Sequence, residues 1–313
     1  MIGLAQIFNR VAVLIPCLNE EASIVAVIEE FRQVLPELQI YVYDNGSSDQ
    51  TVSKAKHAGA LVRSHPIRGK GNVVRRMFAD IEADIYCLVD GDGTYDAKTL
   101  PLMIEALTQQ KLDMVSAIRE LKSEKAYRPG HQWGNRCFTG LINRLFGTRD
   151  NQISDLLSGY RVFSKRFVKT FPVISQGFEI ETELVIHALQ LSIPYSEIPS
   201  SYYERKKGSS SKLSTYKDGI RILKMVCRLL EQEKPFLFFG LIALILFICG
   251  LSLGIPLIMT YLKIGLVPKF PTAILSTGLI VLAFLNFFSG LILHSLAVLR
   301  KEMKQLAYLS YEA

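Results

Sequence analysis

The sequence is poor in cysteine and histidine, and neither residue type forms a pattern typical of a reactive site. The five cysteines have no C-x-x-C spacing and lie mostly in apolar surroundings, as reduced packing residues do. The five histidines are isolated, and the sequence offers no obvious Asp–His pair. We therefore expect no disulfide framework, and we do not expect a histidine to act as a general base.

The sequence also lacks a nucleic-acid motif, although its net charge is +7 and its pI is about 9.1. Basic and aromatic residues are not interleaved in a stripe that would suit nucleic acid. Met1–Arg10 has no apolar core long enough for a signal peptide. We expect a cytosolic globular part whose positive charge faces a membrane surface, and no nucleic-acid partner.

Charge almost disappears from two long stretches in the C-terminal part of the chain, Pro235–Leu262 and Phe270–Leu299. Each exceeds the roughly 20 apolar residues that cross a bilayer. The link between them has Lys263 and Lys269 as its charged residues, so the pattern predicts a hairpin of two transmembrane helices. Two buried core helices are the alternative, but core helices are seldom uncharged over such lengths.

Basic residues flank the hairpin mainly on its outer sides, and this bias predicts its orientation. They are Lys224, Arg228, Lys234, Arg300, Lys301 and Lys304. We expect a multi-pass protein of the inner or plasma membrane with both termini in the cytoplasm. Small residues in the spans would permit a homo-oligomer held by helix contacts, namely Gly250, Gly254, Gly278 and Gly290.

Before these spans, apolar β-branched runs alternate with segments of helical period, which predicts a mainly parallel sheet with helices on both faces. The expected strands lie near residues 11–15, 39–43, 85–89 and 113–117. The expected helices lie near residues 21–35, 50–58, 70–82, 98–110, 134–147 and 179–191. The fold class is therefore α/β and Rossmann-like.

Two of the predicted strands end in polar loops, and one of these loops contains a pair of carboxylates. Asp90 and Asp92 follow the run Ile85–Val89, and a Pro16–Glu20 turn follows the first strand. Residues two apart in an extended segment project from the same side. Open α/β sheets bind ligands at the carboxyl ends of their strands, and Mg²⁺ or Mn²⁺ takes oxygen ligands. We expect a metal site for a diphosphate, with Gly91 letting the backbone approach the ligand; a solvated turn is the alternative.

A basic segment connects the predicted α/β domain to the spans. Its first part, Tyr203–Lys212, combines four cations with small residues and can fold around a phosphate. Its second part, Thr215–Glu233, repeats basic residues at helical spacing beside an apolar face, which predicts an amphipathic helix on anionic headgroups. A disordered linker and an ordinary surface helix are the respective alternatives.

Several motifs follow one another in an order typical of one enzyme family. They are V-L-I-P-C-L-N-E-E at 13–21, Y-D-N-G-S-S-D at 43–49, R-G-K-G at 68–71, D-G-D at 90–92 and S-D-L-L-S-G-Y-R-V-F at 154–163. Over residues 11 to about 213 the chain resembles family 2 glycosyltransferases. R-K-K-G-S-S-S-K-L at 205–213 and the two spans resemble the polyprenyl-phosphate branch, which includes dolichol-phosphate mannose synthase and bacterial undecaprenyl-phosphate glucosyltransferases.

The resemblance implies a GT-A fold, a nucleotide-diphosphate sugar donor and roles for individual residues. Donor-binding residues would be Pro16, Glu20, Asp44, Lys70, Asp90, Asp92 and Arg119. Asp90 and Asp92 would also hold Mg²⁺ or Mn²⁺, and the catalytic residues would be Asp92, Asp155 and Arg119. The acceptor phosphate would meet Arg205, Ser209 and Lys212, with Arg128 and Arg136 as lesser candidates.

The chain departs from the family pattern at two positions near the expected metal. Asn45 stands where many members carry a second Asp, and Thr94 stands where mannose-synthase-like members often have Gln. A third metal contact therefore stays open. The sequence has no Q-x-x-R-W segment near the first span, so we do not expect chain elongation.

The expected reaction is inverting transfer of a single hexose from UDP-glucose or a related UDP-hexose to undecaprenyl or dolichyl phosphate. A lipid phosphate is already ionised near neutral pH, so no strong general base is needed. The alternatives are GDP-mannose as donor, a non-polyprenyl acceptor, or a catalytically inactive lipid-binding scaffold. The expected parts are a GT-A domain at 1–214, an interfacial helix at 215–234, the hairpin at 235–299 and a cytoplasmic tail at 300–313.

Overall fold

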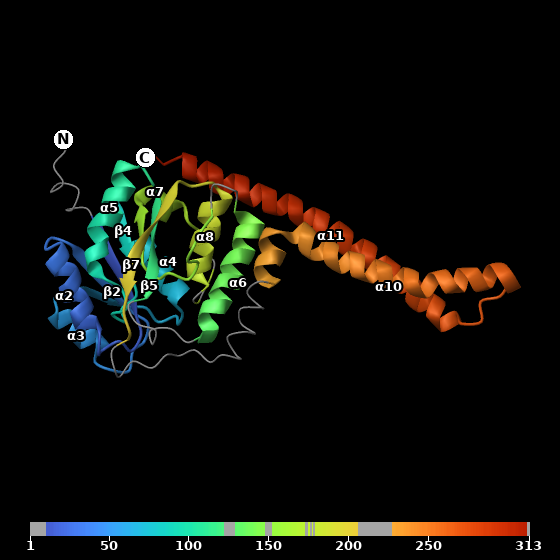
Figure 1. The fold of residues 1–313 in the computed structure, drawn as a ribbon, viewed down its shortest axis with the longest axis horizontal. Helices are drawn as coiled ribbons and strands as arrows, with labels where there is room; N and C mark the ends of the chain where they lie inside the picture. The colour runs from blue at the N-terminus through green and yellow to red at the C-terminus, as the bar shows by residue number, and fades with distance from the viewer. Residues whose placement is uncertain are drawn as a thin grey trace. The chain divides into compact units, whose positions relative to one another are not determined.

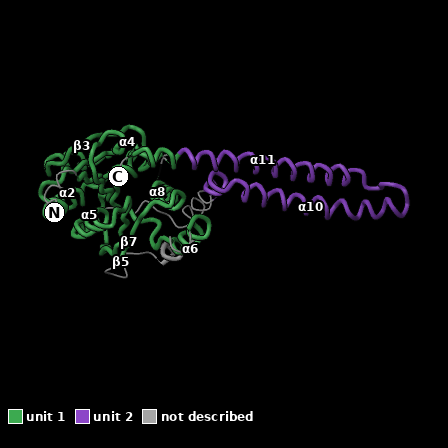
Figure 2. The backbone as a smooth tube through the Cα atoms, turned by 90° about the horizontal axis from the view of Figure 1, so that it is seen from above, with its two compact units in different colours: residues 1–212, 304–313 green, residues 213–303 purple. Residues whose placement is uncertain are grey.

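The computed structural model describes residues 11–121, 129–147, 152–172, 175, 177, 179–205 and 227–311, with the backbone alone at 121, 129–133 and 137 (Figure 1). The chain divides into two compact units (Figure 2). The first comprises Met1–Lys212 together with Lys304–Ala313, and the second comprises Leu213–Met303.

The first unit is built on a seven-stranded sheet in the order β3-β2-β1-β4-β6-β5-β7. The strands are β1 Val11–Cys17, β2 Gln39–Asp44, β3 Leu61–Ser64, β4 Ile85–Leu88, β5 Met114–Leu121, β6 Arg161–Ser164 and β7 Tyr195–Tyr202. Strand β6 runs antiparallel to its neighbours β4 and β5, and the other strand pairs are parallel. The predicted α/β fold with a mainly parallel sheet is confirmed.

The helices of this unit follow the strands closely in sequence. They are α2 Ile24–Val34, α3 Thr51–His57, α4 Lys70–Asp80, α5 Leu100–Gln109, α6 Pro129–Phe146, α7 Lys165–Thr170 and α8 Ile180–Gln190, with a short 3₁₀ turn η1 at Ala97–Thr99. All six expected helices are present, each displaced by a few residues at its ends. Strands β3, β6 and β7 and helix α7 were not predicted from the sequence.

Helices cover both faces of the sheet, which explains why its central strands read as apolar runs rather than alternating patterns. On one face, Val13 of β1 lies in a buried cluster with Phe31 of α2 and Met103 of α5. On the other face, Phe78 of α4 packs edge-to-face against Tyr86 of β4, with ring centroids 6.4 Å apart. The core therefore fixes β1 and β4 at the centre of the sheet, and their carboxyl ends open onto the same edge.

The second unit contains α10 Pro235–Ile264 and most of α11 Phe270–Leu309, which are two long apolar helices. Both are long and apolar enough to cross a membrane. Small residues let the two helices pack closely against each other: the Ser276 hydroxyl donates to the Gly250 carbonyl at 2.8 Å. A Cβ on Gly254 would lie 2.7 Å from Ser276 Oγ, and one on Gly290 would lie 3.0 Å from Phe239 Cβ.

These contacts change the interpretation of the glycines in the spans. Gly250, Gly254 and Gly290, which were expected to permit an oligomer, face the partner helix of the same hairpin. Gly278 alone of the four predicted positions has open space beside it. The glycines thus serve the hairpin, and a homo-oligomer stays a prediction.

The structure also differs from the expected boundaries at the C-terminus. Helix α11 does not end near residue 299 but continues to Leu309, and its last turns belong to the first unit. Most of the predicted interfacial helix, including Lys217, Arg221 and Lys224, lies outside the described residues; residues 227–233 are helical, and Arg228 is exposed. The four-part division of the chain stays a prediction.

Candidate active site

The D-G-D loop follows β4 at the carboxyl edge of the sheet and is held tightly against β1. A Cβ on Gly91 would lie 2.7 Å from the Cys17 sulfur, so the loop can approach β1 only because residue 91 is glycine. The Ser23 hydroxyl donates to the Gly91 carbonyl at 2.7 Å. We expected Gly91 to let the backbone approach a ligand; the close approach that the structure shows is to β1, and it fixes the direction of both neighbouring carboxylates.

Asp92 is almost fully buried at this edge, with 3% of its surface exposed. One carboxylate oxygen accepts hydrogen bonds from the Thr94 hydroxyl at 2.7 Å and the Thr94 amide at 3.1 Å. The other lies 2.7 Å from the Arg205 guanidinium. Burial and the neighbouring Asp90 raise the pKa of Asp92 above its usual value, although Arg205 and Thr94 oppose the shift. Thr94 therefore orients Asp92 in this protein.

Asp90 takes part in a chain of charges that leads into the protein. The Lys70 ammonium lies 2.5 Å from Asp90 Oδ1 and 2.6 Å from Glu181 Oε1. Burial alone would lower the pKa of Lys70, but the two carboxylates raise it above its usual value. Lys70 is the first residue of α4 and Glu181 lies in the first turn of α8, so three elements meet here.

Glu181 was not predicted to be part of the site. Its only signal in the sequence is the acidic start of the predicted helix, in G-F-E-I-E-T-E-L at 177–184. Acidic residues are common in the first turn of any helix, because they favour the positive end of its dipole. The pattern alone could not single out Glu181 from its neighbours.

Gly159 of the S-D-L-L-S-G-Y motif lies directly against the Asp90 carboxylate. A Cβ at this position would lie 2.2 Å from Asp90 Oδ2. The Gly159 amide donates to the Tyr95 hydroxyl at 2.7 Å, which holds the loop in this place. The motif thus contributes a glycine that leaves room for Asp90, in addition to the predicted Asp155.

Asp155 forms a bidentate ion pair with Arg119, which lies on β5. The guanidinium Nε and Nη2 donate to the two carboxylate oxygens at 2.7 and 2.8 Å, and Asn135 of α6 donates at 3.2 Å. Burial would raise the pKa of Asp155, but its hydrogen bonds and attraction to Arg119 lower it below the usual value. The Arg119 guanidinium also lies 5.5 Å from the centre of the Tyr202 ring. The contact of Arg119 with donor phosphates stays a prediction.

The residues expected around the nucleotide lie at the ends of β1 and β2. Pro16 on β1 is opposite Tyr43 on β2. The Asp44 carboxylate accepts the backbone amides of Gly46 at 3.0 Å and Ser47 at 3.2 Å, which fixes the turn after β2. The Glu20 amide donates to Thr51 Oγ1 at 2.9 Å. The structure brings these residues to one edge, while their contacts with a nucleotide stay predictions.

Asn45, one of the departures from the family pattern, holds the loop that leads to Lys70. Its side-chain oxygen accepts the Gly69 amide at 2.6 Å, and its side-chain nitrogen donates to the Ile67 carbonyl at 2.8 Å. Gly69 has a φ of 123°, a backbone conformation that favours glycine. An amide can donate and accept at once, which an ionised Asp cannot do. Asn45 thus positions the start of α4.

Of the predicted acceptor residues, Arg205 is placed beside the D-G-D loop. The strand that precedes it is tied there, because the Tyr203 amide donates to the Thr94 carbonyl at 2.8 Å. Arg136 is exposed on α6, and its role stays a prediction. Arg128, Ser209 and Lys212 lie outside the described residues.

The two carboxylates of the D-G-D loop fit a divalent cation. Within the described ranges no three Asp, Glu, His or Cys side chains form a group that could hold a metal. Mg²⁺ is usually held by one or two carboxylates together with substrate phosphates. Asp90 and Asp92 supply such a pair, and the cations beside them, Lys70 and Arg205, suit phosphate oxygens.

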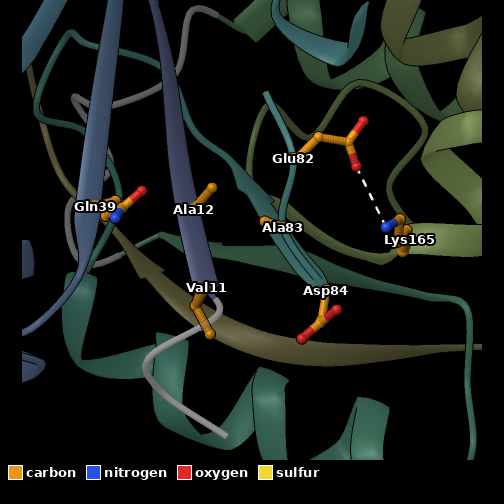
Figure 3. A pocket seen from close by; sticks show the side chains of 7 residues that line it. All are labelled: Val11, Ala12, Gln39, Glu82, Ala83, Asp84 and Lys165. Atoms are coloured by element: carbon orange, nitrogen blue, oxygen red, sulfur yellow. Dashed lines mark ion pairs between the residues drawn. The ribbon is translucent and has the colours of Figure 1, made fainter. Parts of the chain in front are cut away.

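A pocket of about 200 Å³ lies elsewhere, at the opposite edge of the sheet (Figure 3). It is lined by Val11, Ala12, Gln39, Glu82, Ala83, Asp84 and Lys165. Val11 and Gln39 are the first residues of parallel strands, so this is the amino edge. Ligands of open α/β sheets bind at the other edge, and the pocket contains none of the predicted site residues.

The sequence is similar to a family of known proteins and to several of its members. The family described as glycosyl transferase family 2 matches residues 12–171. Glycosyltransferase AglJ of Haloferax volcanii is 33% identical over 250 residues, covering 79% of this chain and 80% of the relative. A dolichyl-phosphate hexose transferase of the same organism is 24% identical over 227 residues, covering 72% of this chain and 96% of the relative.

A solved structure supports the same fold. Glucosyl-3-phosphoglycerate synthase from Mycobacterium tuberculosis, crystallised with Mn²⁺, uridine diphosphate and glucosyl-3-phosphoglycerate, matches with a TM-score of 0.56. The match covers 71% of this chain and 78% of that chain at 23% identity, and it confirms the GT-A-like fold. With the family match and the relative of 33% identity, it agrees with the ordered motifs of the sequence. The chain belongs to glycosyl transferase family 2.

Proposed function

We propose that the protein transfers a single hexose, with inversion, from a nucleotide-diphosphate sugar to a polyprenyl phosphate. UDP-glucose or a related UDP-hexose is the proposed donor, and undecaprenyl or dolichyl phosphate is the proposed acceptor. The protein would be embedded in the inner or plasma membrane, with the catalytic domain and both termini on the cytoplasmic side. The dolichyl-phosphate hexose transferase among its relatives supports an acceptor of this class.

One contact carries this proposal: Arg205 lies 2.7 Å from Asp92. Arg205 is the first cation of the basic segment Tyr203–Lys212, which we expect to hold the acceptor phosphate, and Asp92 belongs to the loop that we expect to hold the donor. Bringing two anionic substrates together requires cations that offset their repulsion. Arg205, in contact with Asp92, supplies one, and its planar guanidinium suits phosphate oxygens.

Departure of the nucleotide diphosphate develops negative charge that the site must stabilise. Asp90 and Asp92 would hold Mg²⁺ or Mn²⁺, which supplies positive charge to the leaving diphosphate. Lys70 and Arg119 would add fixed positive charge near the donor. The acceptor oxygen is already ionised, so the chain needs to position it rather than deprotonate it.

The two apolar helices support a lipid acceptor, because a polyprenyl phosphate cannot leave the bilayer. Anchoring the catalytic domain to the same membrane raises the effective concentration of the acceptor. A soluble acceptor would gain nothing from this anchor. The helices thus favour the lipid acceptor over the alternative of a non-polyprenyl one.

The deciding experiment is transfer of radiolabelled hexose into lipid that extracts into organic solvent. The purified protein is incubated with undecaprenyl phosphate, Mn²⁺ and each of several nucleotide sugars, and the lipid product is identified by mass. Label that appears only in a water-soluble product would contradict the lipid acceptor. If none of the nucleotide sugars is hydrolysed or used for transfer, the result would favour the inactive scaffold.

Arg205→Ala sharpens this experiment. We expect kcat/KM for undecaprenyl phosphate to fall at least about tenfold, because a charge-assisted hydrogen bond is worth about 1.5–3 kcal/mol. Affinity for UDP, measured by calorimetry without lipid, should change much less. Arg76→Ala, which removes an exposed arginine paired with Asp80 on α4, is the matched control. Equal losses of lipid use and UDP affinity would show that Arg205 serves the donor instead.

A further inference from the structure

Glu181 is a buried carboxylate in the candidate site for which the proposed reaction gives no direct use. Its side chain is 10% exposed, compared with 8% for Lys70 and 29% for Asp90. The ammonium of Lys70 therefore lies between a buried carboxylate on one side and a more accessible carboxylate on the other. The two carboxylate partners of Lys70 differ in their exposure. Asp90 can contact a ligand at the edge of the sheet, whereas Glu181 lies deeper in the protein than Asp90.

The position of Glu181 is fixed by contacts of its own backbone. Its carbonyl accepts a hydrogen bond at 2.7 Å from the guanidinium of Arg161, which is fully buried on β6. A second nitrogen of that guanidinium donates to the Leu156 carbonyl at 2.7 Å, which ties the start of α8 to the loop before β6. These bonds hold the backbone of Glu181 in place at the start of α8. The Glu181 carboxylate therefore extends from a fixed backbone position toward the Lys70 ammonium.

The charges of the cluster are unequal in number. Asp90, Asp92 and Glu181 are paired with two cations, Lys70 and Arg205. Among the groups joined by these ion pairs the carboxylates outnumber the cations by one, and the Arg161 guanidinium at the buried end contacts the Glu181 backbone carbonyl rather than its carboxylate. This local excess favours arrival of a cation at the accessible end. Without the charge of Glu181, Lys70 and Arg205 would neutralise Asp90 and Asp92 one to one.

We propose that Glu181 is a positioning residue that shares the Lys70 ammonium with Asp90 and so keeps Asp90 available to a divalent cation. When Asp90 binds the cation, Glu181 retains Lys70 at the edge of the site, where its ammonium can meet the diphosphate of the donor. The inference rests on the proposed function for the identity of the ligands. It concerns metal and nucleotide binding alone, so it does not depend on the acceptor.

The test is Mn²⁺ binding to full-length protein in detergent without lipid or sugar donor, followed by UDP binding at saturating Mn²⁺. Free Mn²⁺ is measured by electron paramagnetic resonance, and UDP affinity by calorimetry. Glu181→Gln removes the charge and nearly preserves the shape. We expect its Mn²⁺ affinity to fall about tenfold or more, because the neutral Gln holds the Lys70 ammonium less strongly than the Glu181 carboxylate does, and Lys70 then competes more strongly with the cation for Asp90.

Two further variants separate this role from a merely structural one. Glu179→Gln makes the same chemical change at the exposed residue before α8, and its Mn²⁺ affinity should stay within about twofold of wild type. Lys70→Met removes the competitor for Asp90. We expect its Mn²⁺ affinity to be equal to or tighter than that of wild type, while its UDP affinity at saturating Mn²⁺ falls about tenfold or more.

A Glu181→Gln variant that is folded and binds Mn²⁺ as tightly as wild type would overturn the inference. So would a Lys70→Met variant that loses Mn²⁺ affinity. If Glu181→Gln does not fold, Glu181→Asp takes its place, because it keeps the charge but withdraws it by one methylene; unchanged Mn²⁺ and UDP affinities would then overturn the inference. Failure of the proposed function appears separately, as normal Mn²⁺ and UDP binding without transfer to lipid.

Discussion

The two edges of the central sheet each hold a buried aspartate paired with arginine, yet they differ in what surrounds that aspartate. At the amino edge, Asp113 accepts hydrogen bonds from Ser164 at 2.5 Å, from Arg166 at 2.6 Å and from the Tyr308 hydroxyl. At the carboxyl edge, Asp92 has Arg205 and Thr94 as partners and a second carboxylate, Asp90, beside it. Burial of an ion pair therefore does not by itself mark a functional site.

The difference lies in what surrounds the pair. Asp113 is enclosed by donors from β6, α7 and the end of α11, and the guanidinium of Arg166 lies 4.4 Å from the centre of the Tyr308 ring. The carboxyl edge instead gathers two carboxylates on one loop. Gly91 lets this loop pack against β1, and Gly159 leaves room for the Asp90 carboxylate. At the amino edge the Asp113 carboxylate is enclosed by its partners, whereas at the carboxyl edge Asp90 and Asp92 lie on one loop with room beside Asp90.

The largest effect that this comparison predicts is on Asp92→Asn. We expect kcat to fall at least about 10²-fold, because a positioned electrostatic contribution to the transition state is typically worth that much. The protein should stay folded, since Asn can still accept from Thr94. Turnover is measured with saturating Mn²⁺, and EDTA should abolish the activity of wild type until Mn²⁺ is added back. Near-normal turnover in the variant, with EDTA harmless to wild type, would exclude a metal role.

Asp113→Asn should lower the stability of the fold and leave turnover nearly unchanged. An amide there turns a donor toward the donors of Arg166, Ser164 or Tyr308, and breaking a buried charged pair costs about 3–5 kcal/mol. We expect the unfolding temperature in detergent to fall by about 6 °C or more. The kcat of the protein that remains folded should stay within about twofold of wild type. A large loss of kcat at unchanged unfolding temperature would erase the contrast between the two edges.

These two aspartates also show what the sequence can reveal. Asp90 and Asp92 were identified because they follow a strongly apolar strand and lie within a motif, and both signals are local. Asp113 also precedes a strand, but nothing near it in the sequence indicates Arg166 or Tyr308, which come from distant segments. The pairing of Lys70 with Glu181 was missed for the same reason: the two residues are brought together by the fold.

The missed strands have a related explanation. β7 reads Y-S-E-I-P-S-S-Y, which is polar and contains Pro199, a residue usually confined to edge strands. It is an edge strand here, and its pairing with β5 rather than its own pattern makes it a strand. β3 and β6 have four residues each, too few to show a period, and, unlike the equally short β4, they are not fully apolar: they read L-V-R-S and R-V-F-S. Apolar strands and amphipathic helices were predictable because their buried positions are occupied by apolar residues, either in a continuous run or at helical spacing.

A smaller effect is expected for Gly159→Ala, which tests the space kept beside Asp90. The added methyl group would lie 2.2 Å from Asp90 Oδ2, so the carboxylate must move. Overpacking of this kind costs about 1–3 kcal/mol, and we expect Mn²⁺ affinity and kcat each to fall about tenfold. Gly140→Ala on α6, where nothing lies within 4 Å of the added methyl, is the matched control and should not lose activity. Equal behaviour of the two variants would show that Asp90 has no need of the glycine.

The smallest effect concerns the last turns of α11. Tyr308→Phe removes the hydroxyl that donates to Asp113 but keeps the ring beside Arg166. Asp113 retains its bonds to Ser164 and Arg166, so the loss should be that of one hydrogen bond to a charged group, about 1.5 kcal/mol. We expect the unfolding temperature to fall by about 3–6 °C with kcat unchanged. Tyr311→Phe, a change at an exposed tyrosine three residues further on, should leave both quantities as they are. If Tyr308→Phe instead lowers kcat at an unchanged unfolding temperature, the amino edge takes part in catalysis, and the two edges of the sheet are less distinct in role than their charges indicate.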